Sequence, residues 1–432
     1  MDERVYIEKD TKTIIFLSAV KMKLTLTQCS YSIYKLGLLL IFLSAQNVWF
    51  LWNLEIYILS LVFLVTIFFV LSLRSLKSYF ELKDISILSL LILFIIQFYI
   101  IRDSLSLSKL FATLFQLGIV STILLLKGDR KIEILNFLVK CLAILLGISL
   151  FFWFFFLLGF NFLPHKTLIF RDELYAFDNY YFYLYDALSI SNLIFPRFNS
   201  VFLEPGQLGM IASFILCIYK FNLKNKYILV IFIATLFTLS LAAYILMFLS
   251  FLLLKFYASR HRIRFIIILT TIIIGGIVVI QNYNEGDNPV NYLIFNRLEV
   301  DEDGDIVGNN RFSGSLESYY DSFIKTDKKY FGLGNVTYLN LFWEGGNAGY
   351  KVFILQYGFV GVFLVFSLYF SIFIRNRSVS GVILFVVYLV CFIQATYPLW
   401  TSVLMLFIIG IPMLCLNDKP KKKNVESSLS YK

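Results

Sequence analysis

The residues best suited to chemistry stand together in the segment FPRFNSVFLEPGQ, where Arg197 and Glu204 flank a short apolar run. A guanidinium group is permanently charged and can hold a phosphate through two parallel hydrogen bonds. The Glu204 carboxylate could pair with Arg197 or accept a proton. An ordinary interfacial anchor containing a charge pair explains these two residues equally well when they are taken alone.

The same segment predicts the start of a helix at Pro205. Proline fits the first helical turn because the amide hydrogen it lacks would have no partner there. The amides that follow, at Gly206 and Gln207, would then lie at the positive end of the helix dipole. This arrangement is a ready site for an anion.

A second group of candidates lies in a long polar loop, where Arg311 opens the sequence RFSGSLESYYDSF and the glycine-rich sequences FGLGN and FWEGGNAGY follow. Glycine lets a ligand approach the backbone closely, but it also forms ordinary turns. For Arg311 alone, a solvated loop residue is the simpler interpretation.

The elements that must position these residues are apolar segments. The composition is 59% hydrophobic and only 15% charged over 432 residues, which excludes a water-soluble fold. Most segments approach the roughly 20 residues that a membrane-spanning helix needs. The twelve segments are 36–52, 54–73, 84–101, 106–126, 132–160, 206–221, 226–240, 241–257, 264–281, 348–374, 379–395 and 397–415. We therefore expect an all-α polytopic membrane protein, a single transmembrane domain over 1–432, with about twelve transmembrane helices.

Basic residues indicate which ends of these segments share a side. Most of the 38 lysines and arginines fall on every second connection and on the two terminal segments. By the positive-inside rule this side is cytoplasmic, and it contains both termini. The seventh and eighth segments meet at Ser240 without a charged break, and joining them would place Arg375 and Arg377 outside. Twelve spans avoid that conflict. The net charge of +10 thus reports topology and not nucleic-acid binding.

Two long connections face the opposite side, at 161–205 and 282–347. Loops of this length in a compact protein are usually functional. We expect the tail at 416–432 to be a short basic cytoplasmic segment, and Met22 is an alternative start to Met1. The five cysteines lie outside both loops, so we expect no disulfide framework there.

The segment Arg197 to Pro205 reads Arg–x–x–Ser–x–Phe–x–Glu–Pro and resembles an element of bacterial O-antigen polymerases. The sequence SLAAYILMF at 240–248 is similar to their next small-residue span, although Leu241 stands where the family usually has arginine. Arg311, FGLGN and YGFVG resemble the far side of the family's second periplasmic loop. The resemblance covers the whole chain as topology and about 195–366 as motifs.

The resemblance implies a glycosyltransferase of the bacterial inner membrane with two long periplasmic loops. Such enzymes join undecaprenyl-diphosphate-linked repeat units into O-antigen or a related surface polysaccharide, with no metal, cofactor or nucleotide sugar. Donor and acceptor are both lipid-linked glycans, and membrane lipids and a chain-length regulator protein are the other implied partners. Arg197 and Arg311 would clamp the diphosphate, with Glu204 as the first candidate base and Glu344 as the second. Further candidates for substrate binding are Arg171, Ser200, Gln207, Glu344 and Asn347.

Two other functions fit the same pattern. O-antigen ligases, which transfer finished polymer to the lipid A core, carry a histidine near the end of the second loop. This chain has only His165 and His261, neither at that place, which favours a polymerase. A flippase or exporter of lipid-linked oligosaccharides also suits twelve spans, but exporters usually have short external loops and polar residues within their spans.

Two shorter patterns have simple interpretations. The aromatic run LYAFDNYYFYLY at 174–185 is typical of a stretch lying among lipid headgroups, although aromatic rings also stack on sugars. Asp301, Asp303 and Asp305 resemble a calcium loop, but its glycine comes one position early and the glutamate at the twelfth position is missing. A hairpin explains this sequence better, so we expect no metal site.

Overall fold

The computed structural model describes residues 26–73, 75–81, 84–100, 107–159, 166–170, 175–185, 196–259, 261–286, 288, 313–341, 349–375, 378–395 and 401–418. The long helices in these ranges are Leu26–Ser44, α2 (Glu55–Ser72), α4 (Ile85–Ile100), α5 (Leu107–Leu125), α6 (Gly128–Leu157), α7 (Pro205–Ile218), α8 (Lys226–Phe237), α9 (Leu241–Ala258), α10 (Arg262–Asn282), α13 (Tyr350–Ile374), α14 (Val379–Gln394) and α15 (Thr401–Asp418). The short helices are η1 (Trp49–Leu51), α3 (Leu76–Tyr79), η3 (Tyr283–Gly286), α11 (Gly314–Phe323), η5 (Asp327–Lys329) and α12 (Asn335–Leu339).

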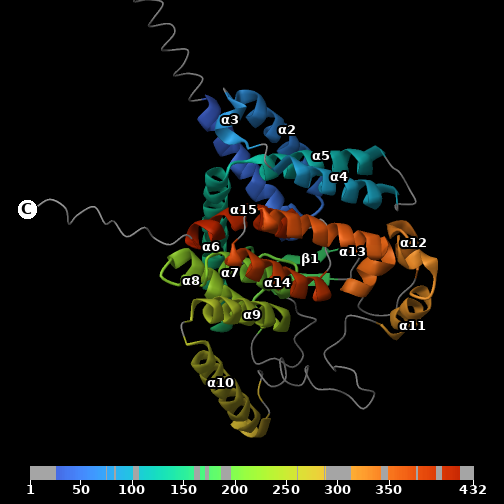
Figure 1. The fold of residues 1–432 in the computed structure, drawn as a ribbon. Helices are drawn as coiled ribbons and strands as arrows, with labels where there is room; N and C mark the ends of the chain where they lie inside the picture. Colours follow the sequence, from blue (N-terminus) through green and yellow to red (C-terminus); the bar gives the residue numbers. More distant parts are fainter. Residues whose placement is uncertain are drawn as a thin grey trace, which may run out of the picture.

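The chain is therefore mostly helical, as predicted, and its long helices run side by side (Figure 1). By length and composition, the helix Leu26–Ser44, α2, α6, α9 and α13 could each cross a membrane. The other long helices lie at the positions of the remaining predicted apolar segments.

The first predicted segment is misplaced. A helix occupies Leu26–Ser44 instead of 36–52, and the chain then turns through η1. Hydropathy missed the first turns because their polar groups are paired inside the protein. The Thr27 hydroxyl donates to the carbonyl of Ser72 at 2.9 Å, and Lys35 forms a 2.8 Å ion pair with Glu133. Local pairing of this kind removes much of the cost that a hydropathy scale assigns to polar side chains.

α7 is the central helix of the bundle. Every side chain from Gln207 to Ile218 is buried, and α7 packs against α8, α9, α14 and α15. The approach to α9 is close, since a Cβ added to Gly209 would lie 2.4 Å from that of Ala243. The Ser213 hydroxyl donates to the Ala243 carbonyl at 3.1 Å, which joins the same two helices. Small residues allow this close contact between apolar helices.

Ion pairs collect at one end of the bundle, here named the basic end. Asp84, which precedes α4, lies 3.5 Å from Lys131 of α6 and 3.5 Å from Arg375 after α13. Lys220 after α7 pairs with Asp418 at the end of α15. Burial opposes ionisation of Asp418, but hydrogen bonds from Lys220 and from Ser380 lower the pKa of its carboxyl below the ordinary value. These contacts bring basic residues from connections far apart in the sequence to the same end, as predicted.

The opposite end carries a small antiparallel sheet that the prediction of an all-α fold did not include. β1 (Lys166–Phe170) pairs with β2 (Tyr175–Asn179), which pairs with β3 (Leu184–Tyr185). The aromatic run predicted to lie among headgroups thus contributes β2 and β3, because aromatic residues favour strands. We name this end the sheet end. In Figure 1 it is the side of β1, α11 and α12, across the bundle from the C-terminus.

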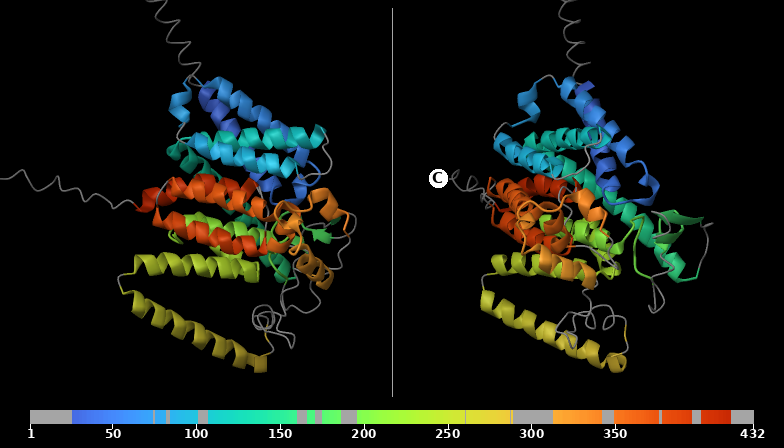
Figure 2. Two further views of the ribbon diagram at one scale, coloured as in Figure 1. Left: turned by 45° about the vertical axis from the view of Figure 1, so that its right-hand side comes forward. Right: turned by 90° about the vertical axis from the view of Figure 1, so that its right-hand side faces the viewer.

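The chain reverses direction between α8 and α9, which resolves the ambiguity at Ser240. Ala243 at the start of α9 contacts Gly209 at the start of α7, whereas Phe251 farther along α9 packs on Phe221 beyond the end of α7, with ring centroids 5.3 Å apart. α7 and α9 therefore run in the same direction, and α8, which packs against α6 and α7, runs in the opposite direction. α10 follows at the edge of the bundle (Figure 2), and each of its described side chains is at least partly exposed.

α13 is interrupted at Gly358, whose backbone adopts φ +65°. The freed carbonyls are paired by the FGLGN segment, since the amides of Leu333 and Gly334 donate to Leu355 and Gln356 at 2.7 and 3.2 Å. The Val360 amide donates to the Tyr330 carbonyl at 3.0 Å. From α4, the Gln97 side chain donates to the Tyr357 carbonyl at 2.9 Å. The backbone groups freed at this interruption are thus hydrogen-bonded by two other parts of the chain, the FGLGN segment with Tyr330 and the Gln97 side chain.

Gly358→Ala tests this junction. A Cβ at Gly358 would lie 2.3 Å from the Tyr330 carbonyl oxygen, and a left-handed backbone costs a non-glycine residue about 1–2 kcal/mol. We expect a lower midpoint of thermal unfolding in detergent and faster proteolysis within 313–341. Gly275→Ala in α10 is the matched control, because no atom lies within 4 Å of its added Cβ. Equal stability of the two variants would contradict the proposed role of Gly358.

Candidate functional site

Arg197 lies at the sheet end, where it is attached to the turn between α8 and α9. Its Nε donates to the carbonyl of Thr238 at 3.1 Å, and the next amide, of Phe198, donates to the Phe237 carbonyl at 2.9 Å. The guanidinium also lies close enough to the phenol of Tyr244 for an electrostatic interaction. The side chain is partly exposed. Two contacts therefore orient Arg197 while leaving it accessible.

The Thr238 carbonyl can accept a hydrogen bond from Arg197 because α8 ends at this point of the chain. Leu239 has φ +46°, which breaks the helical pattern, and the Ser240 hydroxyl accepts a hydrogen bond from Ala243 at 3.4 Å to begin α9. The Thr238 hydroxyl is used locally, donating to the Thr235 carbonyl at 2.7 Å. The run Thr–Leu–Ser thus forms a tight reversal, and an arginine can reach one of its carbonyls.

The segment between Arg197 and Glu204 is buried and held by backbone hydrogen bonds from three directions. The Trp49 amide donates to the Val201 carbonyl at 3.1 Å, and the Leu184 amide of β3 donates to the Ser200 carbonyl at 2.8 Å. Together with the bond from Phe198 to α8, these contacts tie η1, the sheet and α8 to one segment. The sheet therefore has a structural purpose here, since it fixes the backbone that carries Arg197.

The aromatic end of α6 supports the same segment. Trp153 packs on Phe198 and Phe237, with ring centroids 5.6 and 4.9 Å away. One turn along, Phe156 packs on the sheet, 5.5 Å from Tyr183. The aromatic residues at this end of α6 therefore pack behind the candidate site. At these positions they do not form an open surface on which a sugar could stack.

The start of α7 is where the sequence predicts an anion site. The helix begins at Pro205, as expected, and Glu204 is the residue that precedes it. The Glu204 side chain makes no capping hydrogen bond to α7, but its carbonyl accepts from the Gln207 amide at 3.2 Å. The Gln207 amide is thus already used within the first turn. The anion site expected at the amides of Gly206 and Gln207 stays a prediction. The helix dipole still points its positive end toward this surface.

Ser200 and Gln207, two of the predicted substrate-binding residues, are buried. Ser200 has a left-handed backbone, φ +54°, and Gln207 is only 5% exposed. Among the described residues, Ser200 Oγ and Gln207 Oε1 have no hydrogen-bond partner. A buried polar atom without a partner costs about 1–3 kcal/mol, and backbone strain at such positions is concentrated at functional sites. A ligand could contact these atoms only after neighbouring groups move.

The remaining predicted site residues, Arg171, Arg311, Glu344 and Asn347, lie outside the described residues. The proximity of Arg197 to Arg311 thus stays a prediction. Within the part of the chain that the structure describes, no group of three or more histidine, cysteine or acidic residues could hold a metal ion.

Sequence reasoning missed Thr238, Trp153 and Trp49, which hold Arg197 and its segment in place. Thr238 is 41 residues from Arg197 and offers a main-chain carbonyl, so no side-chain pattern marks it. The aromatic run FFWFFF around Trp153 was the one visible signal, but it is equally typical of a lipid-facing helix.

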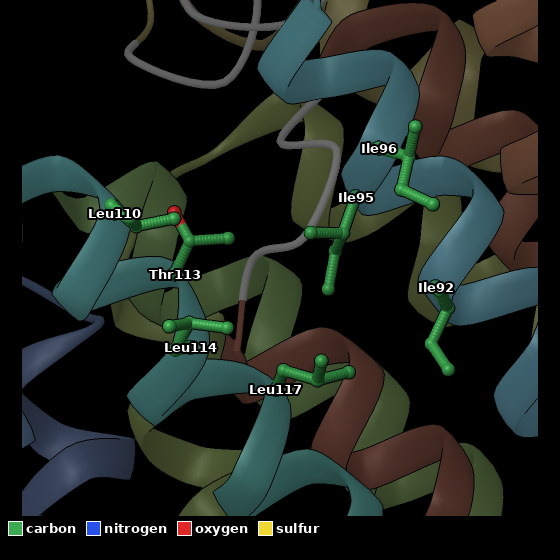
Figure 3. A pocket seen from close by; sticks show the side chains of 7 residues that line it. All are labelled: Ile92, Ile95, Ile96, Leu110, Thr113, Leu114 and Leu117. Atoms are coloured by element: carbon green, nitrogen blue, oxygen red, sulfur yellow. The ribbon is translucent and has the colours of Figure 1, made fainter. Parts of the chain in front are cut away.

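A separate pocket of about 240 Å³ lies between α4 and α5 (Figure 3). Aliphatic side chains and Thr113 line it. It has no charged group to bind a diphosphate, so its chemistry suits hydrocarbon, and we do not include it in the candidate site.

Comparisons with protein-family models, with curated proteins and with solved structures find no match to this chain.

Gly209→Val tests how α7 positions the turn that holds Arg197. The added side chain would meet Ala243, with its Cβ also 3.4 Å from the Thr238 hydroxyl. We expect α7 and α9 to separate at a cost of about 1–3 kcal/mol, the usual range for overpacking. The measurement is thermal unfolding in detergent. Gly276→Val is the matched control, because its Cβ would meet no atom within 4 Å. If both variants have the same midpoint of thermal unfolding, the contact between Gly209 and Ala243 does not limit the stability of the protein.

Proposed function

We propose that this chain is a membrane glycosyltransferase that polymerises undecaprenyl-diphosphate-linked oligosaccharide repeat units into a surface polysaccharide such as O-antigen. The observation that carries the proposal is the arginine of the Arg–x–x–Ser–x–Phe–x–Glu–Pro motif. Arg197 is anchored on the Thr238 carbonyl beside the start of α7, on the end of the bundle opposite the ion pairs of Asp84 and Asp418.

The proposed topology places the sheet end in the periplasm and the basic end in the cytoplasm of the bacterial inner membrane. The positive-inside rule favours this orientation, because the basic residues paired with Asp84 and Asp418 gather at one end. Twelve spans, with both termini cytoplasmic, account for the alternating connections. Arg197 then lies at the surface where the diphosphates of externally displayed lipid-linked glycans would be.

The proposed reaction needs charge stabilisation and one proton acceptor. A hydroxyl of the acceptor glycan attacks the anomeric carbon of the donor, and the bond from that carbon to the diphosphate breaks. The leaving undecaprenyl diphosphate keeps the electron pair, so positive groups placed at its oxygens lower the barrier. Arg197, and by resemblance Arg311, are proposed for this role. Glu204 is the first candidate to take the proton of the attacking hydroxyl, and Glu344 is the second.

Arg197→Ala tests the proposed diphosphate contact. In a strain lacking the chromosomal gene, we expect polymer formation to fall on the order of 100-fold or more, the usual effect of removing one group that stabilises transition-state charge. Arg197→Lys should give a partial loss, because lysine keeps the charge but not the guanidinium fork. Polymer length is measured on gels, and protein amount by immunoblotting.

Lys224→Ala, an exposed basic residue at the basic end, is the control and should form normal polymer. Normal polymer length from an Arg197→Ala variant expressed at the wild-type level would rule out the proposed role of this arginine.

A deletion strain separates the proposed polymerase from its two rivals. We expect the core oligosaccharide to carry a single repeat unit, because export and ligation continue while polymerisation stops. Uncapped core with accumulated lipid-linked polymer would identify a ligase. Single repeat units retained on the cytoplasmic side would identify a flippase or exporter. The measurement is gel analysis of lipopolysaccharide together with analysis of the lipid-linked intermediates.

A further inference from the structure

Three lysines and two exposed aromatic residues follow one another in a segment at the sheet end. Lys325 and Lys328 are exposed, Lys329 is partly exposed, and Lys329 Nζ lies 5.5 Å from the centre of the Tyr330 ring. Phe331 is 61% exposed. We name residues 325–331 the basic–aromatic segment. With Asp327 as its one acidic residue, it is positively charged on a side where connections carry few basic residues.

The segment has a fixed conformation and is not a loose loop. η5 forms its centre, and the Gly332 amide donates to the Lys328 carbonyl at 2.7 Å. On its N-terminal side α11 is joined to α13 by the ion pair between Glu317 and Lys351, 2.6 Å long. On its C-terminal side the Tyr330 carbonyl accepts from the Val360 amide at 3.0 Å. The aromatic residues are therefore held at the level of the interruption in α13.

The length of α13 gives the depth of that level. Seventeen residues separate Gly358 from Arg375 at the basic end, which is about 25 Å of helix. The hydrocarbon core of a bilayer is roughly 30 Å thick. If Arg375 marks one boundary of the core, Gly358 and the backbone paired with it lie close to the other boundary.

Exposed aromatic side chains continue from this level along α13. Phe359 and Phe363 are one helical turn apart and therefore share a face, and Phe363 is 70% exposed. Aromatic rings are favoured at the junction of headgroups and acyl chains, and lysines reach from there to the headgroup phosphates. Lysine, tyrosine and phenylalanine are the residue types that a membrane surface favours, from the headgroup phosphates to the start of the acyl chains.

We propose that the basic–aromatic segment is a binding surface for anionic phospholipid headgroups in the leaflet at the sheet end. The lysines contact the phosphates while Tyr330 and Phe331 enter the interface. The surface would hold the second long loop against the bilayer. This inference is independent of the proposed glycosyl transfer, because it requires only that α13 spans a membrane.

The depth of a fluorescent probe in the lipid bilayer tests the proposal in the full-length chain. Phe331→Cys is made in a chain whose five native cysteines are replaced, labelled with an environment-sensitive fluorophore and placed in nanodiscs containing lipid with a spin-label quencher near the headgroup. Ser318→Cys, an exposed position of α11, is the matched control. We expect at least twofold stronger quenching at Phe331→Cys, and a further increase when phosphatidylcholine is replaced by an equal mixture with phosphatidylglycerol. Equal quenching at both positions would overturn the proposal.

The lysines are tested by the triple substitution Lys325→Gln, Lys328→Gln and Lys329→Gln in the Phe331→Cys chain. Each lysine near an anionic surface contributes a factor of roughly five to binding, so the response to phosphatidylglycerol should disappear. A response that survives the triple substitution would overturn the assignment to these lysines. A response to trace undecaprenyl phosphate without one to phosphatidylglycerol would assign the surface to the lipid carrier instead, and would also overturn the proposal. Size-exclusion profiles verify that each variant is folded.

Discussion

Pairing of backbone polar groups in an apolar bundle is the constraint on which this structure depends. A helix satisfies its own amides and carbonyls, so every interruption must find partners elsewhere in the chain. Two interruptions illustrate this constraint, the reversal at Thr238–Ser240 and the break at Gly358. The first provides a carbonyl to Arg197, and the second is sealed by FGLGN and Gln97. Residues that look like loop connections are thus part of the packing of the bundle.

The same constraint explains why the candidate site lies where it does. The segment that carries Arg197 is almost fully buried, so its own amides and carbonyls also need partners. They find them on the turn around Trp49, on β3 and on the end of α8. A guanidinium attached to such a segment keeps its position without a rigid helix beneath it. Preorganisation of this kind is what electrostatic stabilisation of a leaving group requires.

The sequence predicted the features that depend on local chemistry. Apolar length located most of the helices, and Pro205 marked the start of α7 because proline favours the first turn of any helix. Features set by distant contacts were not predictable. The polar first turns of Leu26–Ser44 depend on partners such as Ser72 and Glu133, and Arg197 is oriented by a carbonyl 41 residues away. The sheet was missed because aromatic residues suit both strands and membrane interfaces.

The two ends of the bundle are built differently, and this difference has a consequence for mechanism. At the basic end, charged side chains link α4, α6 and α13, and others link α7 and α15. Breaking a buried ion pair leaves a charge without its partner, so these contacts resist movement of the helix ends. At the sheet end, backbone hydrogen bonds and aromatic packing join segments that end in turns, and a partly exposed ion pair, Glu317–Lys351, joins α11 to α13. Small shifts there change contacts without exposing a charge to hydrocarbon. An end of this kind can adjust its surface while the opposite end keeps the helices in register.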